Sequence, residues 1–161
     1  MTIHRASIHR TAGHWPKENA AGTLTLDFDG RYRRRIRLTA DQGENVLLDL
    51  PNAVAMADGD GVQLDDGRWL KIQAAPELVV EIRHQDFHQL VRLAWHLGNR
   101  HLPMEIRDQV LRIRPDHVIE DMLHRLGADL VKVQTPFQPE GAAYRDRGHD
   151  HNHTHNGHHH G

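Results

Sequence analysis

The chain has 161 residues, of which 38% are hydrophobic, and its formal net charge is −2. It has room for one ordinary domain or two small ones, and it lacks the global basic field of many nucleic-acid-binding proteins. The absence of cysteine excludes disulfides, thiolate zinc sites and thiol redox chemistry, whereas 16 histidines supply the side chain that proteins use most for divalent transition metals.

Residues 22–75 carry the period-two alternation and the turn residues of a β-rich unit. The predicted strands lie at residues 23–28, 33–38, 46–50, 62–64 and 69–72. Pro51 should stop the third strand, and the Asp-Asp-Gly turn between the last two predicts a hairpin. Residues 1–75 are therefore expected to form a small β-sandwich or open barrel, with the first residues as an arm of uncertain order. His4, His9 and His14 lie in that arm and are assigned no role.

The pattern changes after Ala75, where strands and helices alternate. Predicted strands lie at residues 78–82, 104–106, 110–113 and 130–133. Asp86 and Asp116 are the expected N-caps of two helices, which Gly98 and Gly127 should end. The apolar positions of the two helices, expected to face inward, are Phe87, Leu90, Val91, Ala94, Trp95 and Leu97, then Val118, Ile119, Met122, Leu123 and Leu126. The order β-α-β-β-α-β predicts a ferredoxin-like unit over residues 76–138, and an α+β fold for the chain.

The last segment, residues 139–161, loses apolar periodicity and is expected to be disordered without metal. Its candidate ligands are His149, His151, His153, His155, His158, His159 and His160. Histidines alternating along a flexible chain can converge on one ion, because each later ligand binds at high effective concentration. Neutral imidazole suits nickel, copper and zinc, and protons should displace these metals below a pH of about 6. A purification tag and a merely solvated polar tail are the two alternatives, and the interleaved Asp, Asn, Thr and Gly favour metal binding.

Histidines also lie at the ends of the predicted helices. His96 and His101 flank the end of the first helix, and His101 falls in the loop before Leu102 and Pro103. His117 lies in the first turn of the second helix. One or two such histidines per chain do not complete a metal site, whereas a two-fold dimer doubles the set. The hypothesis is therefore that paired His101 side chains bind metal at a dimer interface, completed by tail histidines, with His96 and His117 as further candidates.

Three other functions compete with metal carriage. An enzyme is disfavoured because the sequence has no nucleophile elbow, P-loop or His-Glu-x-x-His motif. The basic run at residues 31–37 is the feature that could indicate a nucleic-acid binder, but a solvated, edge-protecting strand face is the favoured explanation. The run could equally bind an acidic protein. A general zinc, copper or nickel buffer without a dedicated client is the third alternative. No window approaches the roughly 18 apolar residues of a membrane span, so a cytoplasmic protein is expected.

A recognisable motif lies at residues 97–101. Its sequence, Leu-Gly-Asn-Arg-His, resembles the most characteristic motif of the urease accessory protein UreE family, the nickel metallochaperones. Residues 35–39, 46–51, 58–60 and 74–77 are similar to the N-terminal domain of that family, and residues 136–144 resemble its segment before the tail. The resemblance covers nearly the whole chain.

The resemblance implies a homodimer joined through ferredoxin-like domains, with His101 binding Ni²⁺ at the interface and the tail recruiting or storing metal. It also implies delivery to apo-urease together with an accessory GTPase complex, with the N-terminal domain as the partner-binding module. Some members carry a His-x-His pair near the start of the second helix. Here Pro115 replaces the first of these histidines and His117 stands for the second, so the pair is broken.

Overall fold

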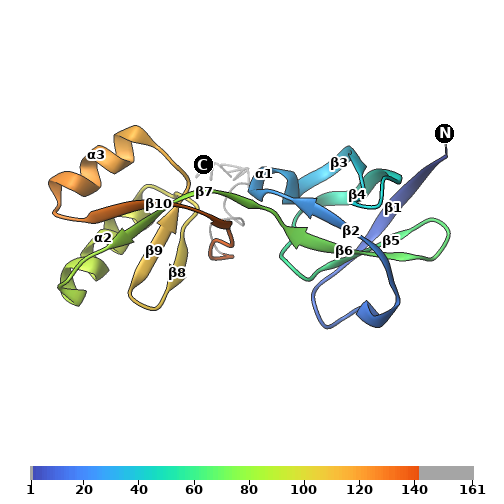
Figure 1. Ribbon diagram of the computed structural model, residues 1–161, viewed down its shortest axis with the longest axis horizontal. Coiled ribbons are helices and arrows are strands. Elements are labelled where there is room, and N and C mark those ends of the chain that lie inside the picture. The colour runs from blue at the N-terminus through green and yellow to red at the C-terminus, as the bar shows by residue number, and fades with distance from the viewer. Residues whose placement is uncertain (1, 142–161) are drawn as a thin grey trace, which may run out of the picture.

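The computed structural model describes residues 2–141, which form two β-sheets, each with its own core (Figure 1). The expectations for residues 142–161, including the tail histidines, lie outside the described residues. The chain contains both helices and two separate sheets, so it has the predicted α+β class. The last strand of the N-terminal sheet ends at Ala74, and the first strand of the C-terminal sheet begins at Pro76, so a single residue joins the two sheets.

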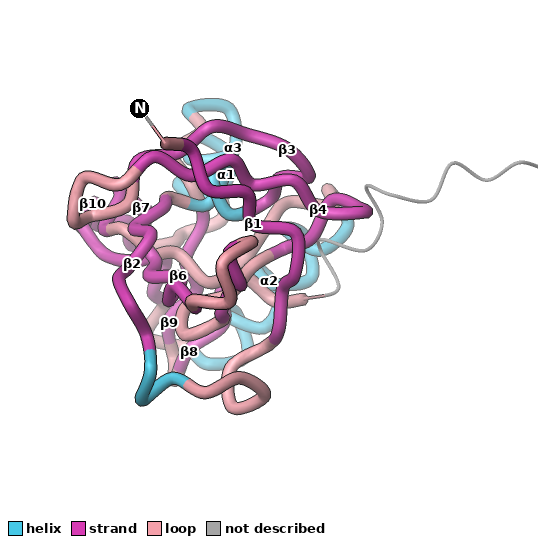
Figure 2. Tube along the Cα trace, turned by 90° about the vertical axis from the view of Figure 1, so that its right-hand side faces the viewer, coloured by secondary structure: helices cyan, strands magenta, loops and turns pink. Residues whose placement is uncertain are grey.

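The N-terminal sheet has six strands in the order β2-β6-β5-β1-β4-β3. The elements are β1 (Ile3–Arg10), the 3-10 turn η1 (Lys17–Asn19), β2 (Ala20–Leu26), α1 (Phe28–Arg31), β3 (Tyr32–Thr39), β4 (Asn45–Ala55), β5 (Gly61–Leu64) and β6 (Trp69–Ala74). The strands curve around a single core (Figure 2), and the backbone of Asp41, beside edge strand β3, donates to Thr23 O of edge strand β2 at 2.8 Å. This is the open-barrel alternative, because one curved sheet encloses the core.

The structure settles one open point and corrects two expectations for this part. The first residues, whose order was left uncertain, form β1, which pairs with β4 in parallel and with β5 in antiparallel orientation and so lies inside the sheet. Phe28 lies in the short helix α1, which Asp27 caps by accepting from the Gly30 N–H. Strand β4 continues past Pro51, although its pairing with β3 is interrupted there, as a residue without an N–H requires.

The C-terminal sheet has the order β10-β7-β9-β8 with all neighbours antiparallel. Its elements are β7 (Pro76–Arg83), α2 (Phe87–Asn99), β8 (Glu105–Arg107), β9 (Val110–Ile113), α3 (His117–Arg125) and β10 (Asp129–Pro136). This is the strand order of a ferredoxin-like fold, as predicted. The two helices pack on one face of the sheet through Leu90, Leu93, Leu97, Ile119 and Leu123, all of which are buried.

The caps of the two helices were predicted correctly at three of four ends. The Asp86 carboxylate accepts from the His88 N–H at 2.9 Å, and the Asp116 carboxylate accepts from Val118 and Ile119. Gly127 adopts a φ of 83° just after α3, as a C′ glycine does. Gly98 was assigned wrongly, because α2 continues to Asn99 and Arg100 occupies the C-cap.

The α3 cap gives a first testable expectation. Replacing Asp116 by alanine should lower the free energy of unfolding by about 1 kcal/mol, because two N–H groups of the first turn lose their acceptor. Urea denaturation of both proteins measures this. Asp121→Ala, at an exposed position inside the same helix, is the control and should change little. Equal losses in the two variants would contradict the capping role.

An exposed apolar stripe runs along α2, where an inward face was expected. Phe87, Val91 and Trp95 are spaced four residues apart and are 65%, 51% and 64% exposed. Residues at this spacing share one face of a helix, and the buried face is instead Leu90, Leu93 and Leu97. Val118 on α3 is likewise exposed, at 60%. The helix periodicity therefore contains two apolar faces, of which only one belongs to the core of this chain.

A buried arginine connects the two sheets. Arg31 is 1% exposed and donates to three backbone carbonyls: Met56 O at 3.2 Å, Leu26 O at 2.9 Å, and Phe137 O just beyond β10. Phe137 is itself fully buried, against Phe28 and Val79. A solvated strand face was the favoured explanation of the basic run at residues 31–37, and for Arg31 this was wrong, because it ends the short helix α1 and its side chain is buried. Its side chain fixes the start of the C-terminal segment against the N-terminal sheet.

Candidate metal-binding sites

His101 occupies a special backbone position directly after α2. Its φ is 53°, a left-handed conformation that is uncommon for residues other than glycine, and its N–H donates to Gly98 O at 3.1 Å. Such a conformation costs of order 1 kcal/mol or more, so the surrounding turn must hold it in place. The side chain is exposed. The helix end therefore presents the His101 imidazole at a fixed point on the surface.

The other two internal candidates lie near the same end of the C-terminal sheet. His96 is half-buried on α2 and meets the Trp95 ring edge-on, with the ring centroids 5.1 Å apart. His117 is exposed at the first position of α3. Within residues 2–141, neither these two nor His101 belongs to a group of three ligand atoms within 4.8 Å of one another. A single chain therefore does not bring these three histidines together into one metal site.

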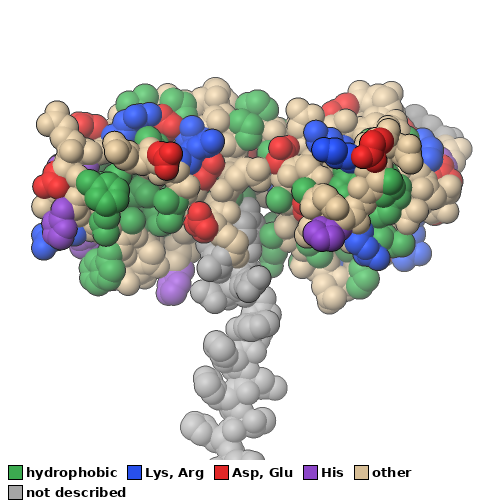
Figure 3. All heavy atoms as spheres, turned by 90° about the horizontal axis from the view of Figure 1, so that it is seen from below, with side chains coloured by type: hydrophobic (Ala, Val, Ile, Leu, Met, Phe, Trp, Pro, Cys, Tyr) green, Lys and Arg blue, Asp and Glu red, His purple; other side chains and the backbone are tan. Residues whose placement is uncertain are grey.

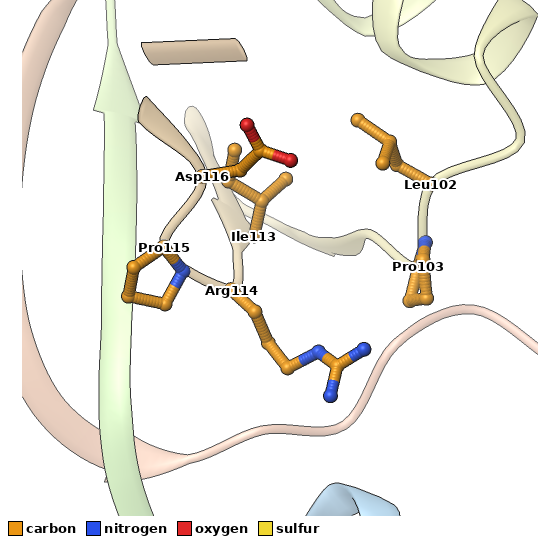
Figure 4. Close-up of a pocket in the computed structure, with 6 residues that line it drawn as sticks. All are labelled: Leu102, Pro103, Ile113, Arg114, Pro115 and Asp116. Atoms are coloured by element: carbon orange, nitrogen blue, oxygen red, sulfur yellow. The ribbon is translucent and has the colours of Figure 1, made fainter. Parts of the chain in front are cut away.

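A hollow of about 340 Å³ separates the segments that carry His101 and His117 (Figure 4). Leu102 and Pro103 form one side, and residues 113–116 form the other. Arg114, from the second side, forms an ion pair with Asp29 of α1 at 2.8 Å and lies over the Phe28 ring. The hollow has one cationic side chain, already paired, and the N-cap carboxylate of Asp116. It offers no histidine of its own.

The start of the C-terminal segment is bound next to the loop of His101. The Glu140 N–H donates to Met104 O at 2.8 Å, three residues beyond His101, and the Gln138 N–H donates to a Glu105 carboxylate oxygen at 3.4 Å. Gln138 also accepts from the Asp58 N–H of the N-terminal sheet at 3.2 Å. Sequence reasoning did not anticipate this attachment, because it depends on contacts between distant segments.

Hydrophobic side chains gather on the part of the surface built by the C-terminal sheet and its helices (Figure 3). The stripe of Phe87, Val91 and Trp95 is exposed as well, and it ends about one helical turn before the last residue of α2, Asn99. Large exposed apolar groups arranged in a stripe indicate an interaction surface. The candidate ligand therefore follows directly after the helix that carries the candidate interface.

The N-terminal sheet contains a second group of ligand atoms that the sequence did not reveal. A ring nitrogen of His4 and carboxylate oxygens of Asp65 and Asp66 lie within 4.8 Å of one another. His4 is separated from the aspartates by about sixty residues of sequence, with β1 and the β5–β6 turn bringing them together. The only sequence signal was the Asp-Asp-Gly turn, and nothing in it pointed to His4.

The carboxyl groups around His4 are shifted toward the charged form. A hydrogen bond from His4 lowers the pKa of Asp65, and the backbone N–H and guanidinium of Arg68 lower the pKa of Asp66. The guanidinium of Arg68 also lowers the pKa of Glu44. In return, Glu44 and then Asp66 raise the pKa of Arg68. All three carboxylates are therefore deprotonated at neutral pH.

Comparison with known proteins follows the division into two sheets. The model for the UreE urease accessory protein, N-terminal domain, matches residues 3–75, and the model for its C-terminal domain matches residues 77–161. No helix among the described residues has the length and apolar character needed to span a membrane.

Several proteins named urease accessory protein UreE are similar over most of this chain. The protein from Rhodopseudomonas palustris (strain HaA2) is 54% identical over 140 residues, which cover 87% of this chain and 65% of that protein. The protein from Beijerinckia indica is 50% identical over 147 residues, covering 91% and 84% respectively. That from Chelativorans sp. (strain BNC1) is 47% identical over 143 residues, covering 89% and 90%.

The lengths of these relatives differ. This chain spans 65% of the Rhodopseudomonas protein and 66% of a relative from Bradyrhizobium sp. (strain ORS 278), which is slightly less than two thirds of each. The two family models together nevertheless match nearly every residue from Ile3 onward. The chain belongs to the UreE family of urease accessory proteins.

Proposed function

We propose that this chain is a nickel metallochaperone that binds Ni²⁺ at a homodimer interface through His101 and through the histidines of residues 149–160, and delivers it for assembly of the urease active site. The observation that carries the proposal is the position of His101, exposed in a fixed left-handed turn at the end of α2. Imidazole is a good ligand for nickel, and an exposed ligand can release its ion to a client.

The stripe on α2 supports the homodimer. Phe87, Val91 and Trp95 are large apolar side chains that the core of this chain does not use. A two-fold axis beside them would bury both copies of the stripe against each other, because such an interface joins the same patch on both subunits. The same axis would bring the two His101 side chains toward one ion. Two imidazoles per dimer then form the core of a site that a single chain lacks.

The attachment of Glu140 to Met104 supports a role for the C-terminal histidines at the same site. The contact holds the start of the segment three residues from His101. Seven residues lie between Gly141 and His149, and the eight chain steps from one to the other can span at most roughly 28 Å. The first tail histidines are therefore within reach of the His101 ion, and the others can take up further ions. His96 and His117 are secondary candidates near the same helix ends.

The family membership supports nickel and the client. Donor chemistry alone favours copper over nickel, so the choice of metal follows from the relatives being named for urease. Those names describe accessory proteins, which agrees with a non-enzymatic carrier in the cytoplasm. Apo-urease and its accessory GTPase complex are the proposed partners. The N-terminal sheet is proposed as the partner-binding domain, over residues 1–75, with the dimerisation domain at 76–138.

Calorimetric titration with Ni²⁺, Zn²⁺ and Cu²⁺ tests the metal-binding part of the proposal. The full chain, a truncation after Gly148, His101→Ala, and the truncated His101→Ala protein are compared. Truncation should remove most sites and leave one ion per dimer, because only the His101 pair remains. Adding His101→Ala should remove that ion, because both interface imidazoles are lost.

Activation of apo-urease separates a chaperone from a general metal buffer. The nickel-loaded full chain should activate apo-urease faster than an equal amount of free Ni²⁺ held by a small chelator. An equal rate would identify a buffer without a dedicated client. Unchanged Ni²⁺ stoichiometry in the truncated His101→Ala protein would contradict the two-site description.

A further inference from the structure

Three segments of the N-terminal sheet converge on the His4 side chain. His4 lies on β1, Glu44 precedes β4, and Asp65 and Asp66 form the β5–β6 turn. His4 Nδ1 lies 2.9 Å from an Asp65 oxygen and 3.6 Å from an Asp66 oxygen. His4 Nε2 lies 3.5 Å from a Glu44 oxygen. Each ring nitrogen therefore faces a carboxylate, and the side chain is only 24% exposed.

This arrangement has the form of a metal-binding histidine with its supporting group. In metalloproteins one ring nitrogen binds the ion, while the other donates a hydrogen bond to a carboxylate that fixes the tautomer. In the structure, His4 Nδ1 is hydrogen-bonded to Asp65 Oδ1 at 2.9 Å, and Nε2 lies 3.5 Å from a Glu44 oxygen. A cation that takes the place of the proton on Nδ1 would leave the remaining ring proton on Nε2, which faces Glu44. One nitrogen and two carboxylate oxygens within 4.8 Å make a mixed set that suits first-row divalent ions.

The charge of the group is also complementary to a divalent cation. Glu44, Asp65 and Asp66 contribute three negative charges, and Arg68 contributes one positive charge. The Arg68 guanidinium binds both oxygens of Glu44 and also Asp66 Oδ2, the oxygen that lies 3.6 Å from His4 Nδ1. The Arg68 N–H donates to Asp66 Oδ1, and no hydrogen bond or ion pair joins Arg68 to Asp65 in the described part of the chain. The three carboxylates therefore outnumber the single guanidinium, and His4 adds a positive charge only when it is protonated. A bound dication would compensate the excess negative charge.

We propose that His4 Nδ1, Asp65 and Asp66 bind a first-row divalent cation such as Zn²⁺ or Ni²⁺, with Glu44 as the positioning residue for His4. Water would complete the coordination, because one face of the group is open to solvent. The site lies on the N-terminal sheet and uses none of the histidines proposed to bind nickel. It is independent of the proposed function.

Nitrogen-15 NMR of the full-length chain during titration with ZnCl₂ tests the site residue by residue. The His4 ring nitrogens report ligation directly, and the amides of residues 65–67 report it from the turn. We expect Nδ1 of His4 to show the shift of a metal-bound nitrogen and the three amides to move with the same dependence on Zn²⁺. Resonances of His101 are followed in the same spectra, so success or failure at the two sites is distinguished.

Matched variants separate binding from a purely structural role. His4→Gln should abolish the Zn²⁺-dependent movement of the 65–67 amides, and Glu44→Gln should weaken it by about tenfold, as loss of a supporting carboxylate does. His14→Gln, which replaces an exposed histidine bonded to Thr11 and Ala12, should change nothing. Spectra without metal show whether each variant is folded. Unmoved His4 ring resonances at saturating Zn²⁺, or amide movements that persist in folded His4→Gln, would overturn the proposal.

Discussion

Replacing Arg31 by methionine should lower the free energy of unfolding by about 3 kcal/mol, because buried carbonyls left without a donor each cost about 1–3 kcal/mol. Methionine preserves the length and apolar stem of the side chain but donates nothing. Leu26 O keeps the Ala75 N–H as a second donor, at 2.8 Å. Met56 O and Phe137 O lose the guanidinium that joins them. Urea denaturation followed by circular dichroism measures the loss.

Arg33→Met is the matched control for this experiment. Arg33 lies on the adjacent strand β3 and is exposed. Its substitution removes the same guanidinium group as Arg31→Met does. Surface changes of this kind usually stay within about 0.5 kcal/mol. Equal destabilisation by the two substitutions would show that Arg31 contributes only its charge and not its buried hydrogen bonds.

The same substitution should loosen the start of the C-terminal segment. Phe137 O is the acceptor that ties this segment to Arg31, and the next residues continue to Met104. Hydrogen exchange should therefore speed up at Gln138 and Glu140 in Arg31→Met and not in Arg33→Met. Through Arg31, the N-terminal sheet therefore helps to fix the point, near His101, from which the histidine-containing C-terminal segment begins.

The C-terminal sheet was predictable because its signals are local. Asp86 and Asp116 precede periodic apolar segments, and the capping hydrogen bonds span only two or three residues. The order of elements then restricts the topology to a few possibilities. The position of His101 just after the first helix of this sheet was predicted from local signals too, and its role as a metal ligand stays a prediction.

The N-terminal sheet was harder to predict because its pairings are long-range. Strand β1 carries His4, Arg5, His9 and Arg10, so its polar character hides a central position between β4 and β5. The group around His4 depends on that pairing and could not be seen in the sequence. Arg31 was misplaced for the same reason, since the basic run gives no sign that one arginine turns inward.

The α2 helix shows a different limit of sequence reasoning. Apolar periodicity indicates which residues avoid water, but it does not distinguish a core from an interface. Phe87, Val91 and Trp95 satisfied the helical pattern as well as Leu90 and Leu97 did, and only the structure separates the two faces. The helix is apolar on more of its surface than its own sheet can cover.

Replacing Trp95 by lysine should convert the proposed homodimer into a monomer and remove the Ni²⁺ that the truncated chain retains. Buried tryptophans at interface centres contribute about 2 kcal/mol or more to association, and an unpaired ammonium in an apolar interface adds a desolvation cost. Folding of the single chain should change little, because Trp95 is 64% exposed. Sedimentation equilibrium gives the oligomeric state, and calorimetry of the chain ending at Gly148 gives the nickel stoichiometry.

Val131→Lys is the control, because Val131 is an apolar side chain with 50% exposure on the sheet face that lies away from the helices. It introduces the same charge without touching the α2 stripe, so the dimer and its nickel site should persist. Measuring the oligomeric state and the nickel stoichiometry on the same variants distinguishes the possible outcomes. A Trp95→Lys monomer that still binds Ni²⁺ at His101 with unchanged affinity would show that one chain completes the site alone. A Trp95→Lys dimer would place the two-fold axis elsewhere and separate the stripe from His101.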